Sequence, residues 1–379
     1  MSLINIASEL ILAASAGIGP FYLLWRKLHS KNRLIVVHPD AAADALRLQQ
    51  IYGYNAHSLV SISGERRFWF NDKKEGAVSY NEKGNVWIVG GEPITSERSL
   101  LPTTREFLAY ARTKKKKVAF LPVTERFARQ LDPNKFDMVK IGAAPYFDLQ
   151  NWNPRGNKAK HLRVALNNSK RAGLSVAEIT QVTECFRNEV AELSEQWLKS
   201  RRAKVTFGWL FALNVFEKAE NKKFFAVRDE SGKLVGVLAA SPIPLRDGWY
   251  LEDILRAEDA QKGTSELLIY ETLKILSSQG AKLATLGTVP LSEKGADNLT
   301  TSHNRLTKMS LKLSRRKLNG IYNFEGLQCF KSKFVPTWWE SEYAVSGRGR
   351  FSALRIVHAL FYIIVPGGIA ETIRAFLDS

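Results

Sequence analysis

The sequence contains few cysteines and too few acidic residues to balance its basic ones. Only Cys185 and Cys329 occur in 379 residues, and neither stands in a metal-binding or disulfide pattern. We therefore predict two reduced core thiols in a cytosolic domain, with no metal site and no disulfide framework. The 37 Asp and Glu residues face 55 Lys and Arg residues, which leaves a net charge of +18. This excess favours a polyanionic partner, either nucleic acid or an anionic membrane.

The long apolar run at the N-terminus is interrupted. Residues 3–25 are mostly apolar, but they include Asn5, Glu9 and Pro20, and basic residues follow at once. This pattern predicts a membrane anchor or an interfacial helix over residues 1–30, with a core helix of a soluble domain as the alternative. A signal peptide is disfavoured because no Lys or Arg precedes the run. By the positive-inside rule, the chain behind an anchor faces the cytoplasm at the cell inner membrane.

The rest of the chain is typical of a globular α+β protein. With 45% hydrophobic residues and 379 residues in all, it can form two domains with cores. The first half predicts a helix at 41–52, strands at 57–63, 66–70, 76–81 and 86–91, a helix at 103–111, a lysine run at 114–117 and a strand at 118–123. The second half predicts strands at 223–227, 234–240 and 249–255, a turn at 229–232, then a helix and a strand at 282–289. The repeated order predicts an internal duplication, although any α+β chain can give such a match.

A charged strand end in the second half is the first candidate site. The predicted strand 249–255 contains Asp253 near its end, and Arg256 follows it. A carboxylate and a guanidinium this close together can bind a charged substrate, or they can form a structural salt bridge.

A helix start behind this strand is the second candidate. Gly263 precedes a helix whose cap is Thr264 or Ser265, and Gly280 ends that helix in the left-handed position. Backbone amides at a helix start attract anions. A phosphate-bearing or carboxylate-bearing substrate is therefore expected over Gly263, unless the glycine only makes a turn.

A basic helix candidate joins the two halves. Residues 155–174 contain no Asp or Glu, end at Gly173 and keep an apolar side that includes Leu162 and Leu166. A solvated basic face is the common alternative, but the lack of acidic partners favours contacts to phosphates. The predicted phosphate-binding residues are Arg155, Lys158, Lys160, Arg163, Lys170 and Arg171.

Three further segments follow the second half. A second basic helix is predicted at 303–317, residues 324–343 place aromatic residues around Lys331 and Lys333, and an apolar helix at 351–365 is expected to lie on lipid or on the protein. The predicted divisions of the chain are 1–30, 33–150, 151–175, 176–345 and an amphipathic tail at 346–379.

Several short motifs stand in a fixed order along the chain. They are VGGEPI (Val89–Ile94), KIG (Lys140–Gly142), the linker KAKHLRVALNNSKRAGL, EDILR (Glu252–Arg256), Gly263 before its helix, LGTVPLS (Leu286–Ser292) and FKSKFVPTWW (Phe330–Trp339). Together they resemble one enzyme family, the phosphatidylglycerol lysyltransferases of the multiple peptide resistance factor type. The resemblance is to their C-terminal catalytic domain and runs roughly from Arg33 to Tyr343. The family often has Asp where Glu92 stands and Ala where Val289 stands, and the polytopic flippase region of its well-known members is absent from this sequence, so lipid translocation is not implied.

The resemblance implies two tandem GNAT-like acyltransferase domains and a transfer of lysine or alanine from aminoacyl-tRNA to a lipid hydroxyl. Phosphatidylglycerol is the expected acceptor, and the transfer would change membrane surface charge and antimicrobial resistance. The implied partners are aminoacyl-tRNA, bound by the basic linker helix, and an anionic phospholipid membrane. No cofactor is implied.

The implied site combines recognition of an ammonium with stabilisation of an oxyanion. Asp253 fits the ammonium partner, Arg256 can orient Asp253 or hold the terminal phosphate, and Lys331 or Lys333 can face the oxyanion or the lipid phosphate. The six histidines are scattered and no Ser-His-Asp arrangement is recognisable, so we expect direct transfer without a covalent enzyme intermediate. The expected catalytic residues are Asp253, Arg256 and Lys331, and the expected substrate-binding residues are Glu252, Gly263, Thr264, Gly287, Pro290, Ser292 and Lys333.

Three other functions compete with this interpretation. An acyl-CoA-dependent N-acyltransferase would need a glycine-rich pyrophosphate loop, which the loop AEDAQKGTSE does not supply. A non-catalytic membrane-binding or nucleic-acid-binding module would explain the charge but not Asp253 and Glu252 in a basic cleft. A tRNA-dependent cell-wall aminoacyltransferase would share the donor and differ only in the acceptor.

Overall fold

The fold was analysed in a computed structural model that describes residues 39–64, 66–200, 213–300 and 323–349, together with 352, 355, 356, 358 and 359. All of these belong to one compact unit, residues 38–379. The predicted N-terminal apolar helix, the basic helix at 303–317 and most of the apolar helix at 351–365 lie outside the described residues. No helix within the described ranges is both long enough and apolar enough to cross a membrane.

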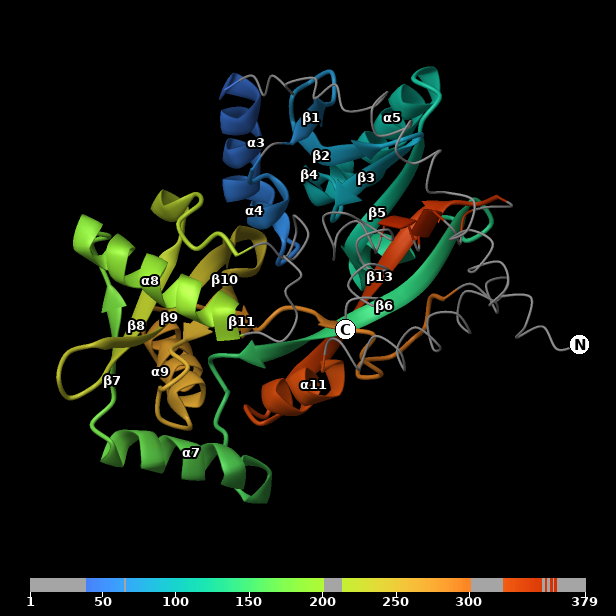
Figure 1. The fold of residues 1–379 in the computed structure, drawn as a ribbon. Helices are drawn as coiled ribbons and strands as arrows, with labels where there is room; N and C mark the ends of the chain where they lie inside the picture. Colours follow the sequence, from blue (N-terminus) through green and yellow to red (C-terminus); the bar gives the residue numbers. More distant parts are fainter. Residues whose placement is uncertain are drawn as a thin grey trace, which may run out of the picture. The chain divides into compact units, whose positions relative to one another are not determined.

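The first half consists of two helices, a meander of strands and two further helix-strand steps (Figure 1). The predicted helix at 41–52, the helix at 103–111 and the strand at 118–123 are confirmed within α3, α5 and β5. The elements are α3 (Pro39–Tyr52), α4 (Ser58–Ser61), β1 (Arg67–Phe70), β2 (Gly76–Lys83), β3 (Val86–Gly90), β4 (Ile94–Thr95), α5 (Leu100–Thr113), β5 (Lys117–Thr124), α6 (Glu125–Arg129) and β6 (Phe136–Asp148).

The second half begins with the predicted basic helix, now bounded as α7 (Lys160–Arg171). Strands at 223–227, 234–240 and 249–255 are confirmed, and Gly280 has the expected left-handed backbone, with φ +87. The remaining elements are β7 (Ser175–Ile179), α8 (Glu184–Ser200), β8 (Lys223–Arg228), β9 (Leu234–Ile243), β10 (Gly248–Arg256), α9 (Thr264–Ser278), β11 (Leu283–Thr285), β12 (Val289–Pro290), α11 (Phe324–Ser332) and β13 (Trp338–Gly347).

The two halves repeat one order of elements. In the first, β1, β2 and β3 are antiparallel neighbours, and after α5 the chain returns as β5 parallel to β3. In the second, β8, β9 and β10 are antiparallel neighbours, and after α9 the chain returns as β11 parallel to β10. This is the order that a duplication of one α/β unit requires. The α+β class is therefore confirmed, while the domain boundaries stay a prediction.

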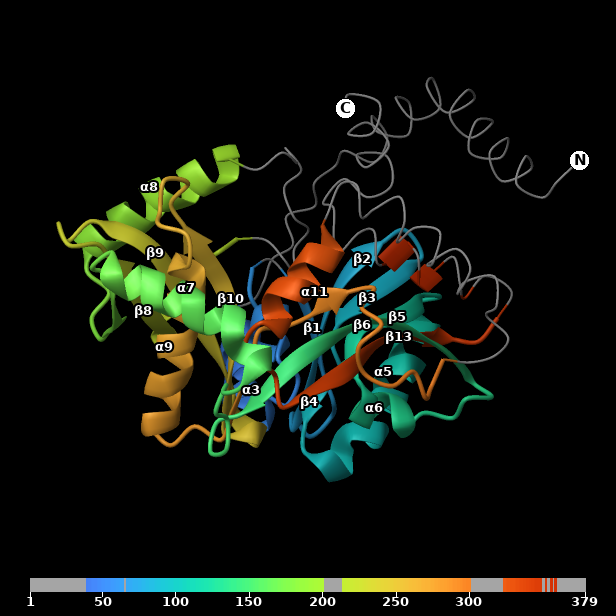
Figure 2. The same cartoon turned by 90° about the horizontal axis from the view of Figure 1, so that it is seen from below.

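A single mixed sheet connects the halves in the order β1-β2-β3-β5-β13-β6-β11-β10-β9-β8-β7. The last described strand, β13, lies between β5 and β6 of the first half, and β6 in turn pairs with β11 of the second (Figures 1 and 2). The sheet is therefore shared by the two halves. The side-by-side pairing of β13, β6 and β11 brings residues that are far apart in the sequence together at its centre.

Apolar residues cover both faces of this sheet. Helices α7 and α9 pack over the second half through Leu162 and Leu166 of α7 and Leu273 and Leu276 of α9, spaced as the helical period requires. Helix α8 covers the opposite face, where Phe186, Val190 and Leu193 are buried. The first half has a corresponding core under α5, which includes Phe107, Phe120 and Tyr343.

Three predictions of local structure were wrong. Residues 57–63 form no strand and instead contain the short helix α4 (Ser58–Ser61), because the Ser61 and Ser63 hydroxyls donate to the carbonyls of Ser58 and Leu59 and satisfy the backbone locally. The strand predicted at 282–289 ends at Thr285. Both cysteines are free as predicted, but they are exposed and are not core thiols.

Candidate active site

Strand β10 contains a β-bulge at its two acidic residues. Its pairing with β9 advances three residues from Leu251 to Ile254, while β9 advances only two. The extra residue interrupts the alternation of side chains, and bulges of this kind re-aim side chains and are common beside active sites. Glu252 and Asp253 lie in this bulge, and both are influenced by the same lysine, Lys222.

Glu252 is held by a buried ion pair. The Lys222 ammonium forms a salt bridge with the Glu252 carboxylate, and the two side chains are only 5% and 6% exposed. Removing either partner would leave an uncompensated charge in the interior. The sequence did not reveal Lys222, because it stands beside Lys223 directly before a strand and resembles an ordinary surface lysine.

Asp253 forms no salt bridge of its own among the described residues. Its carboxylate accepts a hydrogen bond from the backbone N–H of Asn214. Burial, and then the negative charge of Glu252, raise the pKa of Asp253 to about 7, although Lys222 acts in the opposite direction. A cation that arrived beside this carboxyl group would favour its ionised form. The ammonium role predicted for Asp253 therefore fits its surroundings.

Arg256 does not contact Asp253. Its exposed guanidinium donates a hydrogen bond to the carbonyl of Ala257 at 3.3 Å. The predicted pair of Asp253 and Arg256 is absent because the bulge turns the carboxylate toward Lys222 and the segment that contains Asn214. The other predicted role of Arg256, binding the terminal phosphate of the donor, stays a prediction.

The start of helix α9 packs closely against α7. Gly263 has φ +103, and a Cβ there would lie 2.6 Å from the Ser169 Oγ and 2.8 Å from the Ala165 carbonyl oxygen, both in α7. Only glycine permits this close approach of the two helices. Thr264 is fully buried and its hydroxyl donates to the carbonyl of Gln261. Gly263 and Thr264 therefore have structural contacts here, and a substrate over Gly263 stays a prediction.

Lys331 is buried and holds a loop by its backbone. Its ammonium donates to the carbonyls of Leu286, Gly287 and Thr288 at 2.6, 2.9 and 3.1 Å. Burial lowers the pKa of Lys331 to about 7, and the charge of Glu342 counteracts this. All three donors of the ammonium are used, so this conformation offers none to an oxyanion. These three carbonyls follow directly after the end of β11 at Thr285.

The Tyr250 ring joins the bulge to this loop. Its pKa is raised well above the ordinary value, by burial and then by the charges of Glu252, Asp253 and Glu342. Gly287 has φ +70, and a Cβ at that position would collide with the ring of Tyr250. Tyr250 therefore remains a neutral phenol between the carboxylates of β10 and that of β13.

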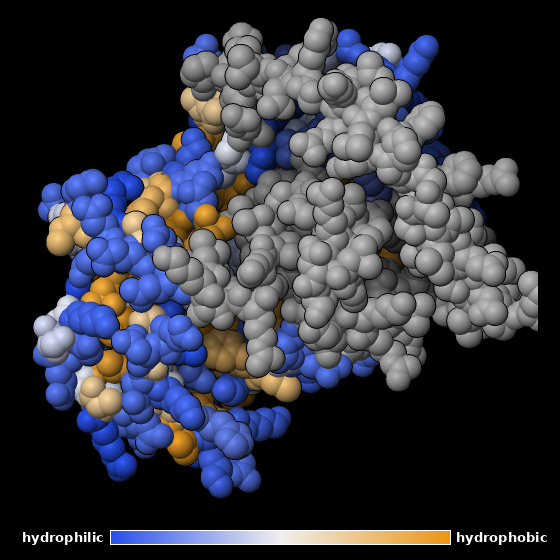
Figure 3. Space-filling model, viewed as in Figure 1, coloured by the Kyte–Doolittle hydropathy of each residue, from blue (hydrophilic) through white to orange (hydrophobic). Residues whose placement is uncertain are grey.

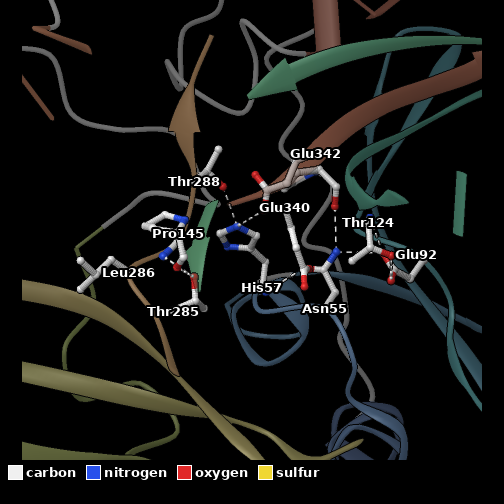
Figure 4. Close-up of polar contacts among 12 residues, drawn as sticks. Asn55, His57, Glu92, Thr124, Pro145, Thr285, Leu286, Thr288, Glu340 and Glu342 are labelled. Carbon is white, nitrogen blue, oxygen red and sulfur yellow. Dashed lines mark hydrogen bonds and ion pairs between the residues drawn. The ribbon is translucent and has the colours of Figure 1, made fainter. Parts of the chain in front are cut away.

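A polar network surrounds His57, whose ring packs on Tyr250 (Figure 4 shows the network). The His57 ring is 5.1 Å from the Tyr250 ring, edge to face, and its Nε2 lies 2.9 Å from the Thr288 hydroxyl and 3.7 Å from the Glu342 carboxylate. The backbone N–H of His57 donates to Asn55 Oδ1 at 2.9 Å. Sequence reasoning did not identify His57 as a site residue. It was predicted in a strand of the first half, with no indication that it lies beside residues of the second half.

The Asn55 side chain links this network to Glu92. Its Nδ2 donates to Glu92 Oε2 at 2.8 Å, and the Thr124 hydroxyl donates to Glu92 Oε1 at 2.8 Å (Figure 4). Glu92 is only 6% exposed. The carboxylate of Glu92, in the VGGEPI motif, thus accepts hydrogen bonds from neutral donors on both oxygens. Through Asn55 it holds the segment that contains His57 in place.

An arginine and three aromatic rings form the wall next to this network. Glu340 binds Arg246 through two hydrogen bonds of 2.9 and 2.6 Å. The guanidinium lies 5.0 Å from the Tyr54 ring and 4.4 Å from the Tyr146 ring, and Tyr146 stacks on Trp338 at 5.6 Å. Sequence reasoning gave no role to any of these residues.

The other predicted substrate-binding residues are spread around the loop that Lys331 holds. Pro290 pairs with Gly142 of β6, and the Ser292 hydroxyl donates to the Gln328 side chain at 2.6 Å. Lys333 forms a salt bridge of 3.0 Å with Glu266 at the start of α9. The structure therefore groups Glu252, Asp253, Gly287 and Lys331 around Tyr250, and leaves Arg256, Gly263 and Thr264 outside this group.

The six basic residues predicted to bind phosphates on or before α7 are all exposed. Two of them already have partners: Arg163 donates to the carbonyl of Gly156 at 2.6 Å, and Lys170 forms a salt bridge of 3.1 Å with Glu271 of α9. The described surface of the second half, which includes α7, is mostly hydrophilic in Figure 3. A contact to phosphates by these residues stays a prediction.

Residues 46–346 match the family described as phosphatidylglycerol lysyltransferase, C-terminal. The chain therefore belongs to this family, which confirms the resemblance inferred from its motifs. Curated phosphatidylglycerol lysyltransferases of Staphylococcus epidermidis and Bacillus subtilis are each 23% identical to it, over 309 and 340 residues. These alignments cover 76% and 88% of this chain but only 34% and 37% of the relatives. The chain thus spans about a third of their length.

Two solved structures share the fold. The structure titled L-PGS from Bacillus licheniformis has a TM-score of 0.70 at 21% identity, and covers 85% of this chain and 96% of that one. The C-terminal domain of a putative lysylphosphatidylglycerol synthetase from Agrobacterium fabrum has a TM-score of 0.69 at 20% identity, with 86% and 97% covered.

Proposed function

We propose that this chain transfers an aminoacyl group from aminoacyl-tRNA to a hydroxyl of a membrane lipid, with phosphatidylglycerol as the acceptor. Membership of the family supports the type of reaction. The single observation that carries the proposal is Asp253, a partly buried carboxyl group whose pKa is raised to about 7 and which lacks a salt bridge among the described residues. The α-ammonium of an aminoacyl ester supplies the cation that this carboxylate lacks.

The chemistry is an exchange of esters. The lipid hydroxyl oxygen attacks the carbonyl carbon, the bond to the tRNA ribose oxygen breaks, and the proton of the lipid hydroxyl ends on that ribose oxygen. We infer that Tyr250, which its surroundings keep neutral, donates a hydrogen bond to the developing oxyanion. Lys331 acts on the backbone of residues 286–288 and so positions the wall of the site. No covalent enzyme intermediate is needed.

The charges of the site favour an amino acid with an uncharged side chain. Glu252 is paired with Lys222, Glu340 with Arg246, and Glu342 lies beside His57 and stabilises the charge of Lys331. Of the carboxylates grouped around Tyr250, Asp253 remains for one ammonium. The internal stretches 201–212 and 301–322 contain no Asp or Glu. A lysyl group carries a second ammonium, so we infer that alanyl-tRNA is a better donor than lysyl-tRNA.

The loop before α9 argues against the acyl-CoA alternative. Enzymes that bind a pyrophosphate at a helix start use a glycine-rich loop with open backbone amides. The loop AEDAQKGTSE contains one glycine, Gly263, and this glycine packs closely against Ala165 and Ser169 of α7.

The test is to compare lipid extracts of cells with and without the protein by mass spectrometry. We expect an aminoacyl phosphatidylglycerol, made at the cytoplasmic face of the inner membrane, where charged tRNA is available and where the product would make the surface less negative. With purified protein, alanyl-tRNA should give faster transfer than lysyl-tRNA. Unchanged lipids together with acylation of a soluble amine from acyl-CoA would refute the proposal, and modified cell-wall precursors would identify a different acceptor.

A further inference from the structure

A basic groove lies in the first half, among α5, the start of β5, the start of β6 and the end of β13. Its volume is about 720 Å³. Seven of its lining residues are basic and only Asp132 is acidic. The groove includes the end of the lysine run at 114–117, a feature of the sequence to which the proposed function assigns no role. The basic residues are Arg105, Arg112, Lys116, Lys117, Lys135, Arg348 and Arg355.

Most of these charges are not neutralised by carboxylates. Lys116 pairs with Glu82 at 2.5 Å and Lys135 with Asp132 at 3.8 Å, while Arg355 is influenced by Asp137. The other four basic residues have no acidic partner among the described residues, and each is exposed. They are Arg105, Arg112, Lys117 and Arg348. A concentration of unpaired cations around a hollow attracts a multiply charged or phosphate-bearing anion.

The remaining lining residues distinguish between the possible anions. Leu101, Leu108, Leu131, Val118 and Phe136 give the groove an apolar floor beneath its basic residues. A nucleic-acid backbone presents phosphates and sugars and gains little from aliphatic side chains, whereas bases are bound by aromatic platforms. An anionic phospholipid has both parts, a phosphate for the cations and acyl chains for the leucines.

We propose that this groove is a docking site for an anionic phospholipid of the membrane surface, separate from the site around Asp253. It would hold the first half of the protein against the bilayer that contains the acceptor lipid. Binding at the groove requires neither tRNA nor catalysis, so it can be tested independently of aminoacyl transfer.

The experiment measures binding of the full chain to vesicles by co-sedimentation. Vesicles of phosphatidylcholine alone are compared with vesicles that contain phosphatidylglycerol. The groove variant is Arg105→Gln, Lys117→Gln, Arg348→Gln, and the matched control is Lys158→Gln, Lys160→Gln, Arg171→Gln, which removes the same charge from α7. We expect the groove variant to weaken binding to the anionic vesicles at least about tenfold, because each basic residue near an anionic surface contributes severalfold. The control should bind nearly as wild type, and thermal unfolding should show that both variants fold.

Three results would overturn the proposal. Equal losses for the two variants would mean that only the net charge matters, and no loss for the groove variant would mean that the membrane is bound elsewhere. A groove variant with normal vesicle binding and weakened tRNA binding would assign the groove to nucleic acid.

A second measurement separates a lipid site from a simple phosphate site. Calorimetry with a soluble short-chain phosphatidylglycerol and with glycerol phosphate compares the same type of charge with and without acyl chains. We expect heat only from the lipid, and expect the groove variant to abolish it. Equal binding of both compounds would show an anion site without a role for the apolar floor, which would refute lipid docking.

Discussion

Each half has a carboxylate near the end of its third antiparallel strand, and the two carboxylates differ in their surroundings. Glu92 follows β3 and accepts hydrogen bonds from Asn55 and Thr124, which are neutral donors from two other segments. Asp253 lies in the bulge of β10, where burial and Glu252 raise its pKa to about 7. The same position in the repeated order is thus fixed in one half and left ready for a cation in the other. We therefore propose that the first half supports the site and that the second half binds the substrate.

The strongest test of this comparison is Asp253→Asn, which removes the charge with little change in shape. If the carboxylate binds the α-ammonium, transfer should fall by roughly 2 to 5 kcal/mol of binding energy, or 30-fold to several thousandfold in kcat/KM. The fold should survive. The matched control is Asp259→Asn, since Asp259 is an exposed partner of Lys233 and should leave activity unchanged. Activity of the Asp253 variant near that of wild type would remove the basis of the proposed function.

The corresponding change in the first half is Glu92→Gln. We expect it to lower the free energy of unfolding more than the rate of aminoacyl transfer. The amide nitrogen of Gln cannot accept from Asn55 or Thr124, so at least one buried donor loses its partner. We expect a loss of about 2 to 3 kcal/mol in the free energy of unfolding, measured by denaturant titration. The exposed Glu75→Gln is the control and should change stability by less than about 0.5 kcal/mol. A fully stable but inactive Glu92 variant would contradict the division of roles between the halves.

The pH dependence of stability offers a third test. Because the folded-state pKa of Asp253 is raised above its unfolded value, the folded protein retains this proton more strongly than the unfolded chain. Its contribution therefore favours folding at low pH and is lost as pH rises through about 7. Asp253→Asn should stabilise the protein relative to wild type, by about 2 kcal/mol more at pH 8 than at pH 5. An equal difference between the two proteins at both pH values would show that Asp253 has an ordinary pKa.

The sequence predicted the order of elements and the family but only part of the site. Asp253 and Lys331 could be selected as candidates because EDILR and FKSKFVPTWW are local motifs, and the strands of the second half follow a clear pattern. Lys222 and His57 were missed because both reach the site by long-range contacts. Lys222 pairs with Glu252 in the bulge of β10, and His57 contacts Thr288 near the paired strands β13 and β6. Contacts of this range leave no periodicity in the sequence. The close contact of Gly263 with α7 could not be predicted for the same reason, since α7 lies about 90 residues earlier in the chain.

The smallest expected effect per residue is on tRNA binding by α7. The residues predicted to bind tRNA can be separated into those that already have a partner in the structure and those that have no ion pair among the described residues. Lys160 and Arg171 form no ion pair with the described residues, whereas Arg163 donates to Gly156 and Lys170 pairs with Glu271. Two double variants to Gln therefore remove equal charge from one helix. If α7 binds phosphates, the loss of Lys160 and Arg171 should reduce the slope of log affinity against log salt by about 1.4 to 1.8, because each contact contributes about 0.7 to 0.9. The loss of Arg163 and Lys170 should reduce it less, because those side chains must give up an existing partner before they reach a phosphate. Filter binding of alanyl-tRNA and lysyl-tRNA across a salt series measures both slopes. The preference between the two donors should be unchanged in both variants, since it depends on Asp253. If the plots of log affinity against log salt for both variants run parallel to that of wild type, the tRNA binds elsewhere on the protein and the charges of α7 form a solvated surface.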